Sequence, residues 1–329
     1  MNAVLSIKNL SITMVQDAGS VNIVRDCNLE LKPGEIHGLV GESGSGKSLT
    51  AMACLGLIPQ KMHLSGSIAM DGQELGAMRH DELRALRGKK AAMIFQNPMT
   101  ALNPYFTIES QMVAVIRQHF GVTKSVARTA AGEALEQAGL NRGALARYPH
   151  QMSGGQLQRV MIGMALACKP RVLIADEPTT ALDVTVQARI LLLLKQLADE
   201  GMAILLITHD LGVVAQVAKR ASVMYAGSIV ESGLIEDVFD NPGHPYTRGL
   251  IASVPKMGQG KCRLTAIDGT VPDFRVPQPG CPFRARCAEA RAVCQTAFPA
   301  TIDVSTTHTV RCVNAVTTIP VTVPVQELA

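Results

Sequence analysis

The sequence contains no tryptophan, and only 3% of its 329 residues are aromatic. Proteins that bind single-stranded nucleic acid stack bases on aromatic rings, so this scarcity argues against that class. The excess of positive over negative residues is small as well, because 31 Lys and Arg residues against 27 Asp and Glu leave a formal net charge of only +4. That bias is too small to indicate a nucleic-acid partner by itself, and we expect none.

Long apolar runs are missing too, although 47% of the residues are hydrophobic. No run approaches the roughly 18 residues that a membrane-spanning helix needs. The start of the chain, residues 1–8, alternates like a strand and lacks the architecture of a signal peptide. We therefore expect a cytoplasmic protein that can bind the inner face of a membrane protein. In that compartment its eight cysteines are not expected to form disulfides.

The run from Gly41 to Ser48 reads G-x-x-x-x-G-K-S, the spacing of a phosphate-binding loop. Glycines let the backbone curl so that successive N–H groups point at an anion. Lys47 is expected to reach the β- and γ-phosphates, and Ser48 to place its hydroxyl on Mg²⁺. A strand-like run precedes the loop and a helical run follows it, which is the context this role requires and a chance surface turn does not.

A second candidate element is the apolar run Arg171–Ala175, which ends in Asp176 and Glu177. A carboxylate at a buried strand end beside a phosphate loop can hold Mg²⁺, and we assign that role to Asp176. Glu177 would sit nearer to the attacking water and act as general base. Apolar strands that end in Asp-Glu are common, so this motif indicates a nucleotide site only in combination with the phosphate loop.

The run Met152–Gln156 is a second Gly-rich element, and a helical run follows it. Ser153 and the two glycines after it can present N–H groups to a phosphate. Ser153 is equally suited to be a helix N-cap. Both interpretations can hold together, because an N-cap is where anions bind.

Hydrophobic periodicity predicts an α/β fold. Period-2 stretches between Val4 and Leu31 indicate antiparallel strands. Further on, buried strands alternate with helices, which indicates a largely parallel sheet covered on both faces. Residues 98–150 have helical spacing and predict a small helical insert. A Pro- and Cys-rich region follows residue 253, and the end of the chain is predicted to be a disordered tail.

In order and spacing, these motifs closely resemble those of an ATP-binding cassette (ABC) ATPase over about residues 4–240. The matching elements are the phosphate loop, Gln96, Ser153–Gln156, Val172–Glu177, Ala181-Leu182-Asp183 and His209. The resemblance implies a P-loop nucleotide triphosphatase core with an antiparallel β subdomain and a helical subdomain. It also implies a head-to-tail pair of cassettes, in which ATP and Mg²⁺ lie between the phosphate loop of one subunit and Ser153, Gly154, Gly155 and Gln156 of the other.

The resemblance assigns roles to further residues. Gln96 would sense Mg²⁺ and the γ-phosphate, His209 would hold the γ-phosphate and the water, and Asp183 would bridge the two subunits. A lone histidine after a strand is more often structural, so the role of His209 rests on the resemblance. The ATP contacts it implies are Gly41, Ser43, Gly44, Ser45, Gly46, Lys47, Ser48 and Leu49, and the magnesium contacts are Ser48, Gln96 and Asp176.

Two positions depart from the usual pattern. Met14 stands where the family often stacks an aromatic ring on adenine, so it would pack against the base without π-stacking. The signature begins with Met152 instead of the usual leucine, a change of similar volume that should be mild.

Two segments narrow the resemblance to ATPase subunits of peptide and nickel importers: Asn241–Leu250 and Gly280–Cys287. This narrower resemblance implies a cassette domain over residues 1–253 and a Cys-rich extension over 254–329. The function that the resemblance implies is that of a subunit that couples ATP hydrolysis to import of di- or oligopeptides, or nickel, at the cytoplasmic face of the bacterial inner membrane. The implied partners are a second, related ATPase in a heterodimer, two permeases, and an extracytoplasmic binding protein.

The cysteines Cys281, Cys287, Cys294 and Cys312 are spaced C-x5-C-x6-C-x17-C. Four thiolates could bind an iron–sulfur cluster or zinc, and the spacing is looser than that of a zinc ribbon. Some proteins that this chain resembles carry a [4Fe–4S] cluster here, so we consider the cluster, zinc and plain thiols as alternatives.

A rival function is that of an ABC ATPase acting on nucleic acid or ribosomes without a transporter. Such proteins usually carry two cassettes per chain, coiled-coil arms or strongly basic linkers. This sequence has one cassette, no long heptad run and little excess charge. An exporter subunit is a third alternative, which the C-terminal resemblance disfavours.

Overall fold

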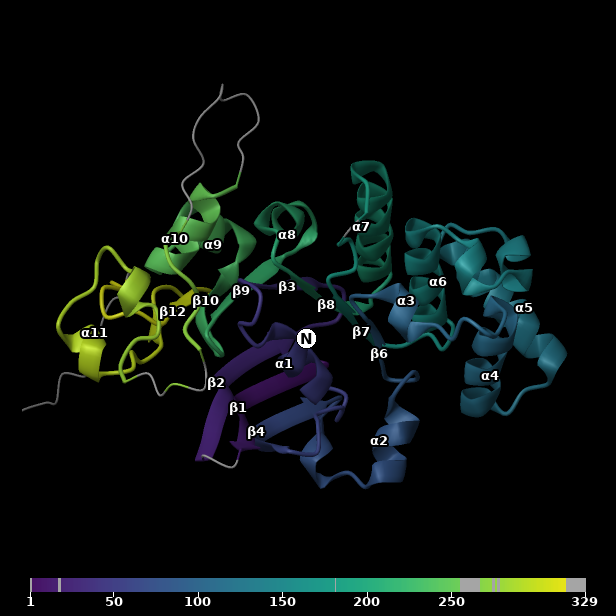
Figure 1. The fold of residues 1–329 in the computed structure, drawn as a ribbon, viewed down its shortest axis with the longest axis horizontal. Helices are drawn as coiled ribbons and strands as arrows, with labels where there is room; N and C mark the ends of the chain where they lie inside the picture. Colours follow the sequence, from purple (N-terminus) through teal and green to yellow (C-terminus); the bar gives the residue numbers. More distant parts are fainter. Residues whose placement is uncertain are drawn as a thin grey trace, which may run out of the picture.

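The computed structural model describes residues 2–16, 19–180, 182–254, 267–273, 276 and 279–317. Two sheets organise the molecule (Figure 1). The predicted disordered tail and Ala181 lie outside the described residues. Within those ranges, no helix combines the length and the apolar character that crossing a membrane would require.

The larger sheet has eight strands and contains the parallel core that the sequence predicts. Strands β9, β3, β8, β7 and β6 are joined by parallel pairs, whereas β10, β12 and β11 add antiparallel pairs at one end. In spatial order the strands are β11 (Ile302–Asp303), β12 (Thr309–Val310), β10 (Ser228–Leu234), β9 (Arg220–Tyr225), β3 (Ile36–Val40), β8 (Ala203–Thr208), β7 (Val172–Asp176) and β6 (Ala91–Ile94).

Both faces of this sheet are covered, which explains why its central strands are continuously apolar. On β7, Leu173 and Ala175 belong to the core that helices α6 (Gly154–Leu166), α7 (Val184–Asp199) and α8 (Leu211–Val217) complete. Val172 and Ile174 point into the second core, which contains α1 (Lys47–Ala53) and the smaller sheet. The alternation follows from the period of two along a strand.

The smaller sheet is antiparallel, as the period-2 pattern predicts. Its spatial order is β2 (Gly19–Leu31), β1 (Leu5–Gln16), β4 (Met62–Met70) and β5 (Gln73–Glu74). After a short 3-10 helix (Leu75–Ala77), helix α2 (His80–Leu86) leads into β6. In Figure 1 this sheet lies beneath α1, so the phosphate loop sits between the two sheets.

The segment after β6 is helical, as predicted for residues 98–150. It contains α3 (Pro98–Ala101), α4 (Ile108–Phe120) and α5 (Lys124–Gln137), and α6 follows. Contacts join α4 to α5, α5 to α6 and α3 to α6, and Figure 1 shows these helices beyond β6 at one end of the molecule. The domain boundaries proposed from the sequence stay predictions.

The C-terminal extension is joined to the main sheet. After α9 (Ile235–Asp240) and α10 (Pro245–Ala252), the chain passes α11 (Val293–Thr296) and returns as β12, which pairs with β10 through Glu231 and Val310. Glu231 is 1% exposed, and its Oε1 accepts a 2.7 Å hydrogen bond from His308 Nε2 of the extension. The sequence predicted neither α9 nor these C-terminal strands.

Candidate functional site

The phosphate loop connects β3 to α1, and its glycines occupy backbone positions that a side chain would not tolerate. Gly41 has φ +154°, and a Cβ there would lie 2.1 Å from the carbonyl oxygen of Met224. Gly46 has φ +102° and is the N-cap of α1. The loop therefore turns tightly against β9 and ends at a helix N-terminus, the arrangement that binds phosphate.

Lys47 is folded back onto the phosphate loop. Its Nζ donates hydrogen bonds to the carbonyl oxygens of Gly41 at 2.7 Å and Glu42 at 2.9 Å. Burial lowers the pKa of Lys47, and the carboxylates of Glu177, Asp176 and Glu42 act in the opposite direction. A cation surrounded in this way is ready to exchange loop carbonyls for a polyphosphate, which is a stronger acceptor.

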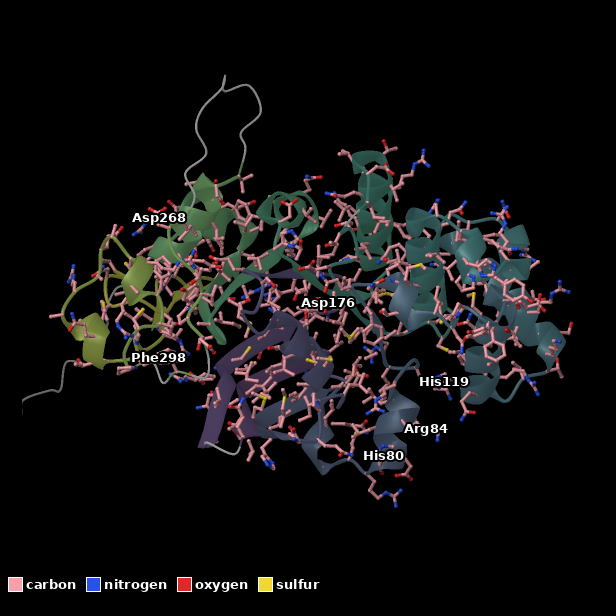
Figure 2. The ribbon with its side chains drawn as sticks, viewed as in Figure 1. His80, Arg84, His119, Asp176, Asp268 and Phe298 are labelled. Atoms are coloured by element: carbon pink, nitrogen blue, oxygen red, sulfur yellow. The ribbon has the colours of Figure 1, made fainter. Side chains whose placement is uncertain are left out.

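Asp176 ends β7 and is 5% exposed (Figure 2). Its Oδ1 is buried and finds no hydrogen-bond partner among the described residues. Burial raises the pKa of Asp176, and the hydroxyl of Ser48 beside it lowers the pKa in part. A buried acceptor without a donor, next to the hydroxyl that follows Lys47, fits an oxygen-liganded Mg²⁺. Asp176 and Ser48 are thus the residues that would hold the ion.

Glu177 is the centre of a hydrogen-bonded group drawn from three parts of the chain. Its Oε2 accepts from Gln96 Nε2 at 2.9 Å and from Thr180 Oγ1 at 2.8 Å. Its Oε1 lies 3.1 Å from His209 Nδ1. Burial would raise the pKa of Glu177, but the hydrogen bonds from Thr180 and His209 outweigh it and hold the pKa below its ordinary value.

The ionised state of Glu177 also determines which ring nitrogen of His209 carries the hydrogen. A carboxylate only accepts hydrogen bonds, so His209 Nδ1 carries the hydrogen and Nε2 is the ring nitrogen left for another group. The side chain of His209 is 59% exposed, whereas that of Glu177 is 13% exposed. The structure thus brings together Gln96, Glu177 and His209, which the sequence placed in one site only through the resemblance.

Ser153 is the N-cap of α6, one of the two interpretations that the sequence left open. It forms a capping box with Gln156, in which Ser153 Oγ accepts from the Gln156 N–H and Gln156 Oε1 accepts from the Ser153 N–H. Ser153 and Gly154 are exposed. In Figure 1, α6 stands among the insert helices, away from α1, which follows the phosphate loop.

Asp183, Met14 and Leu49 take three different positions. Asp183 is the exposed N-cap of α7, and its Oδ1 accepts from the Val186 N–H at 2.9 Å. Met14 is half-buried on β1, opposite Val21 of β2. Leu49 is buried in α1. The adenine contact assigned to Met14 and the bridging role of Asp183 stay predictions.

Three site residues escaped the sequence analysis: Thr180, Tyr246 and Arg286. Thr180 follows Glu177 by three positions, and its N–H donates to the Glu177 carbonyl oxygen in a tight turn. The proline between them is a turn signal that could have identified the pair. Tyr246 and Arg286 contact Glu42 of the phosphate loop from more than 200 positions away, and no local pattern indicates such contacts.

The four cysteines of the extension lie near one another without forming a metal site. The Cys281 N–H donates to the Cys294 carbonyl oxygen, and Cys294 and Cys312 are buried. Burial raises the pKa of Cys281, Cys287 and Cys312, and the neighbouring cysteines add to that effect. Of the residues that the structure describes, no group of three or more His, Cys, Asp or Glu is arranged to hold a metal ion. The geometry does not support the cluster.

These features define a P-loop nucleotide triphosphatase: a loop curled at Gly41 and Gly46, a lysine on that loop, and a strand beside it that ends in Asp-Glu. The sequence matches the family "ABC transporter" over residues 24–180 and the family "Oligopeptide/dipeptide transporter, C-terminal region" over residues 230–294.

Individual relatives agree along nearly the whole chain. The dipeptide transport ATP-binding protein DppD of Bacillus subtilis is 45% identical over 95% of this chain and 95% of its own. The oligopeptide transport ATP-binding protein OppD of Salmonella typhimurium is 45% identical over 91% of this chain and 90% of its own. Among solved structures, the dimeric cassette MJ0796 in a post-hydrolysis state bound to ADP and Pi is 29% identical, with a TM-score of 0.64 over 70% of this chain and 98% of that one.

The chain belongs to the family of ABC transporter ATP-binding proteins, in the group that carries the oligopeptide/dipeptide transporter C-terminal region. It is therefore an ABC-type ATPase, an enzyme class that uses ATP and Mg²⁺.

Proposed function

We propose that this chain is the subunit that couples ATP hydrolysis to peptide import through two membrane permeases. The match over residues 230–294 carries the substrate class, because that region is named for oligopeptide and dipeptide transporters. The relatives DppD and OppD, ATP-binding proteins of dipeptide and oligopeptide transport, support the same class. Nickel is the alternative cargo. In this role the protein lies at the cytoplasmic face of the bacterial inner membrane, and an extracytoplasmic binding protein delivers the peptide.

The arrangement of the site supports a specific division of labour in hydrolysis. Lys47 leaves the carbonyl oxygens of Gly41 and Glu42 and binds the β- and γ-phosphates. Glu177 takes a proton from the attacking water, whose oxygen bonds to the γ-phosphorus as the bond to the β,γ-bridging oxygen breaks. Gln96 and His209 orient Glu177 and the water. Asp176 and Ser48 would hold Mg²⁺, which would neutralise charge on the phosphates.

The second half of each ATP site comes from a partner cassette. Ser153, Gly154, Gly155 and Gln156 are exposed or half-buried at the start of α6, where backbone N–H groups can face the γ-phosphate of the opposite subunit. The dimeric structure of the cassette MJ0796 supports a pair of cassettes, for which we propose the head-to-tail arrangement. Asp183 bridges that pair, and Met14 and Leu49 complete the nucleotide contacts. We infer that the partner is a related second ATPase.

The function is tested by ATP hydrolysis in the complete transporter, reconstituted with its permeases and binding protein in lipid vesicles. Dipeptides, longer peptides and Ni²⁺ are added in turn, and released phosphate is measured. We expect one peptide class to stimulate hydrolysis. Stimulation by Ni²⁺ alone would contradict the peptide assignment, and recovery of ribosomes without permeases in a pull-down from cells would contradict the transporter itself.

A separate question is whether the four cysteines of the extension bind a [4Fe–4S] cluster. The part of the chain that the structure describes includes all four cysteines and contains no group of three or more His, Cys, Asp or Glu arranged to hold a metal ion. We therefore expect anaerobically purified protein to contain less than about one iron or zinc per chain by elemental analysis. Close to four irons per chain, with the visible absorption of a cluster, would restore the cluster.

A further inference from the structure

The C-terminal extension contacts the phosphate loop at Glu42. Arg286 Nη1 lies 3.0 Å from each carboxylate oxygen of Glu42, across a sequence separation of 244. Tyr246 of α10 supports the same residue, because its hydroxyl oxygen accepts a 2.9 Å hydrogen bond from the Glu42 N–H. The loop that curls around Lys47 is thus held from outside by groups that follow β10 in the chain.

Arg286 is held in place by more than this ion pair. Its Nε donates to the carbonyl oxygen of Asp268 at 2.9 Å and its Nη2 to that of Ile267 at 3.1 Å. The guanidinium lies 5.8 Å from the centre of the Tyr225 ring, and the side chain is 6% exposed. A guanidinium with its donors fixed in this way keeps its charge at Glu42.

Glu42 places a negative charge in a loop whose other groups attract phosphate. Its carbonyl oxygen accepts hydrogen bonds from Lys47 Nζ at 2.9 Å and from the Ser45 N–H at 3.2 Å, so its backbone is part of the phosphate-binding curl. Its side chain is 29% exposed, which limits screening by solvent. Without a partner, this carboxylate would repel the phosphates of ATP.

We propose that Arg286 is a positioning residue of the ATP site, which neutralises Glu42 and keeps that carboxylate from opposing ATP binding. The proposal rests on the proposed function, since it concerns the affinity of that same site for ATP. It gives the extension a role in the nucleotide site: the segment that carries Arg286 between Cys281 and Cys287 sets the charge that ATP meets at the loop.

The test is equilibrium binding of Mg·ATP to the full-length chain, measured by titration calorimetry. For Arg286→Met we expect the Kd to rise about three- to tenfold at low salt, and the difference to shrink as salt is added. Adding Glu42→Gln to that variant removes the unpaired charge and should restore the Kd to within about twofold of wild type. A purely structural role of Arg286 would not produce this rescue, because the second substitution restores none of the hydrogen bonds to Ile267 and Asp268.

Arg311→Met is the matched control. Arg311 is 7% exposed, lies 5.1 Å from the centre of the Phe298 ring, and pairs with Asp26 on β2 at 2.6 Å. It therefore resembles Arg286 in burial, aromatic contact and ion pairing, while its partner lies outside the phosphate loop. We expect Arg311→Met to lower thermal stability and to leave the Kd for ATP within about twofold of wild type.

Three results would overturn the proposal: an unchanged Kd in Arg286→Met, a weakened Kd that Glu42→Gln fails to restore, or an equal weakening in Arg311→Met. If Arg286→Met does not fold, Arg286→Gln decides, since it also removes the charge while its amide can still donate a hydrogen bond to a backbone carbonyl. That variant should bind ATP about three- to tenfold more weakly, and failure of Glu42→Gln to restore its Kd would also overturn the proposal. Failure of the wild-type chain to bind ATP would instead contradict the proposed function.

Discussion

Replacing Glu177 by glutamine is expected to stop ATP turnover while leaving ATP binding intact. Glutamine has nearly the same shape and can keep hydrogen bonds to Gln96, Thr180 and His209, because the amide and imidazole groups can exchange donor and acceptor roles. It cannot take a proton from water. Loss of a general base lowers kcat by about 100-fold to 10,000-fold. Phosphate release at saturating ATP measures the loss.

In the proposed pair of cassettes, the same variant should accumulate the ATP-bound dimer, because the ATP held between the two subunits is no longer hydrolysed. Size-exclusion chromatography with light scattering, with and without ATP, detects that shift. Thr180→Val is the matched control: it removes one hydrogen bond to Glu177 but keeps the carboxylate, so turnover should fall by only about tenfold or less. Wild-type turnover by Glu177→Gln would rule out the general base.

The second large effect is expected for Asp176→Asn, which should lower the rate of ATP hydrolysis but raise the stability of the fold. Function should be lost, since asparagine is a weaker Mg²⁺ ligand, and Mg²⁺-dependent hydrolysis should fall about 100-fold or more. The nucleotide-free protein should be more stable, because a buried carboxylate with an unpartnered oxygen becomes a neutral amide. We expect the melting temperature at pH 7 to rise by about 2 °C.

The pH dependence of that stability gain follows from the direction of the pKa shift. Burial raises the pKa of Asp176 above 3.8, so the folded protein binds this proton more tightly than the unfolded chain does. The ionised carboxylate therefore destabilises the fold at neutral pH, and this cost fades as the pH falls toward 3.8. The difference in melting temperature between variant and wild type should narrow over the same range.

Asp210→Asn is the control for this substitution. Asp210 caps α8 by accepting hydrogen bonds from Gly212 and Val213, and asparagine caps a helix equally well, so stability should not change. A lower melting temperature of Asp176→Asn than of wild type, or Mg²⁺-dependent hydrolysis retained in that variant, would contradict the assignment of Asp176.

The sequence predicted the central fold because its signals are local. The apolar run before Asp176 is continuous since β7 is covered on both faces, and Ser153 is the cap that its residue type predicts. The phosphate loop was identifiable because Gly41 and Gly46 adopt backbone angles that other residues avoid. In each case a few adjacent residues determine the structure.

The C-terminal part could not be predicted in this way. Strands β11 and β12 have two residues each, too short for any periodicity. They are defined by pairing, since β12 pairs with the edge of β10 and β11 pairs with β12. The pairing of Glu42 with Arg286 depends on the folded path of the whole chain. The gathering of Gln96 and His209 around Glu177 likewise comes from the sheet topology, since β6, β7 and β8 lie side by side.

The pairing of β12 with β10 makes the cassette and its extension hard to separate. A chain cut after residue 253 would expose β10 as an open sheet edge, which invites pairing with other molecules. It would also remove His308, so that Glu231, which is 1% exposed in the intact chain, would lose this partner and keep only the backbone N–H donors of Gly243 and His244. The boundary visible along the sequence is therefore not a place where the protein can be shortened. An extension grafted from a relative would have to supply both a strand that pairs with β10 and a hydrogen-bond donor for the Glu231 carboxylate.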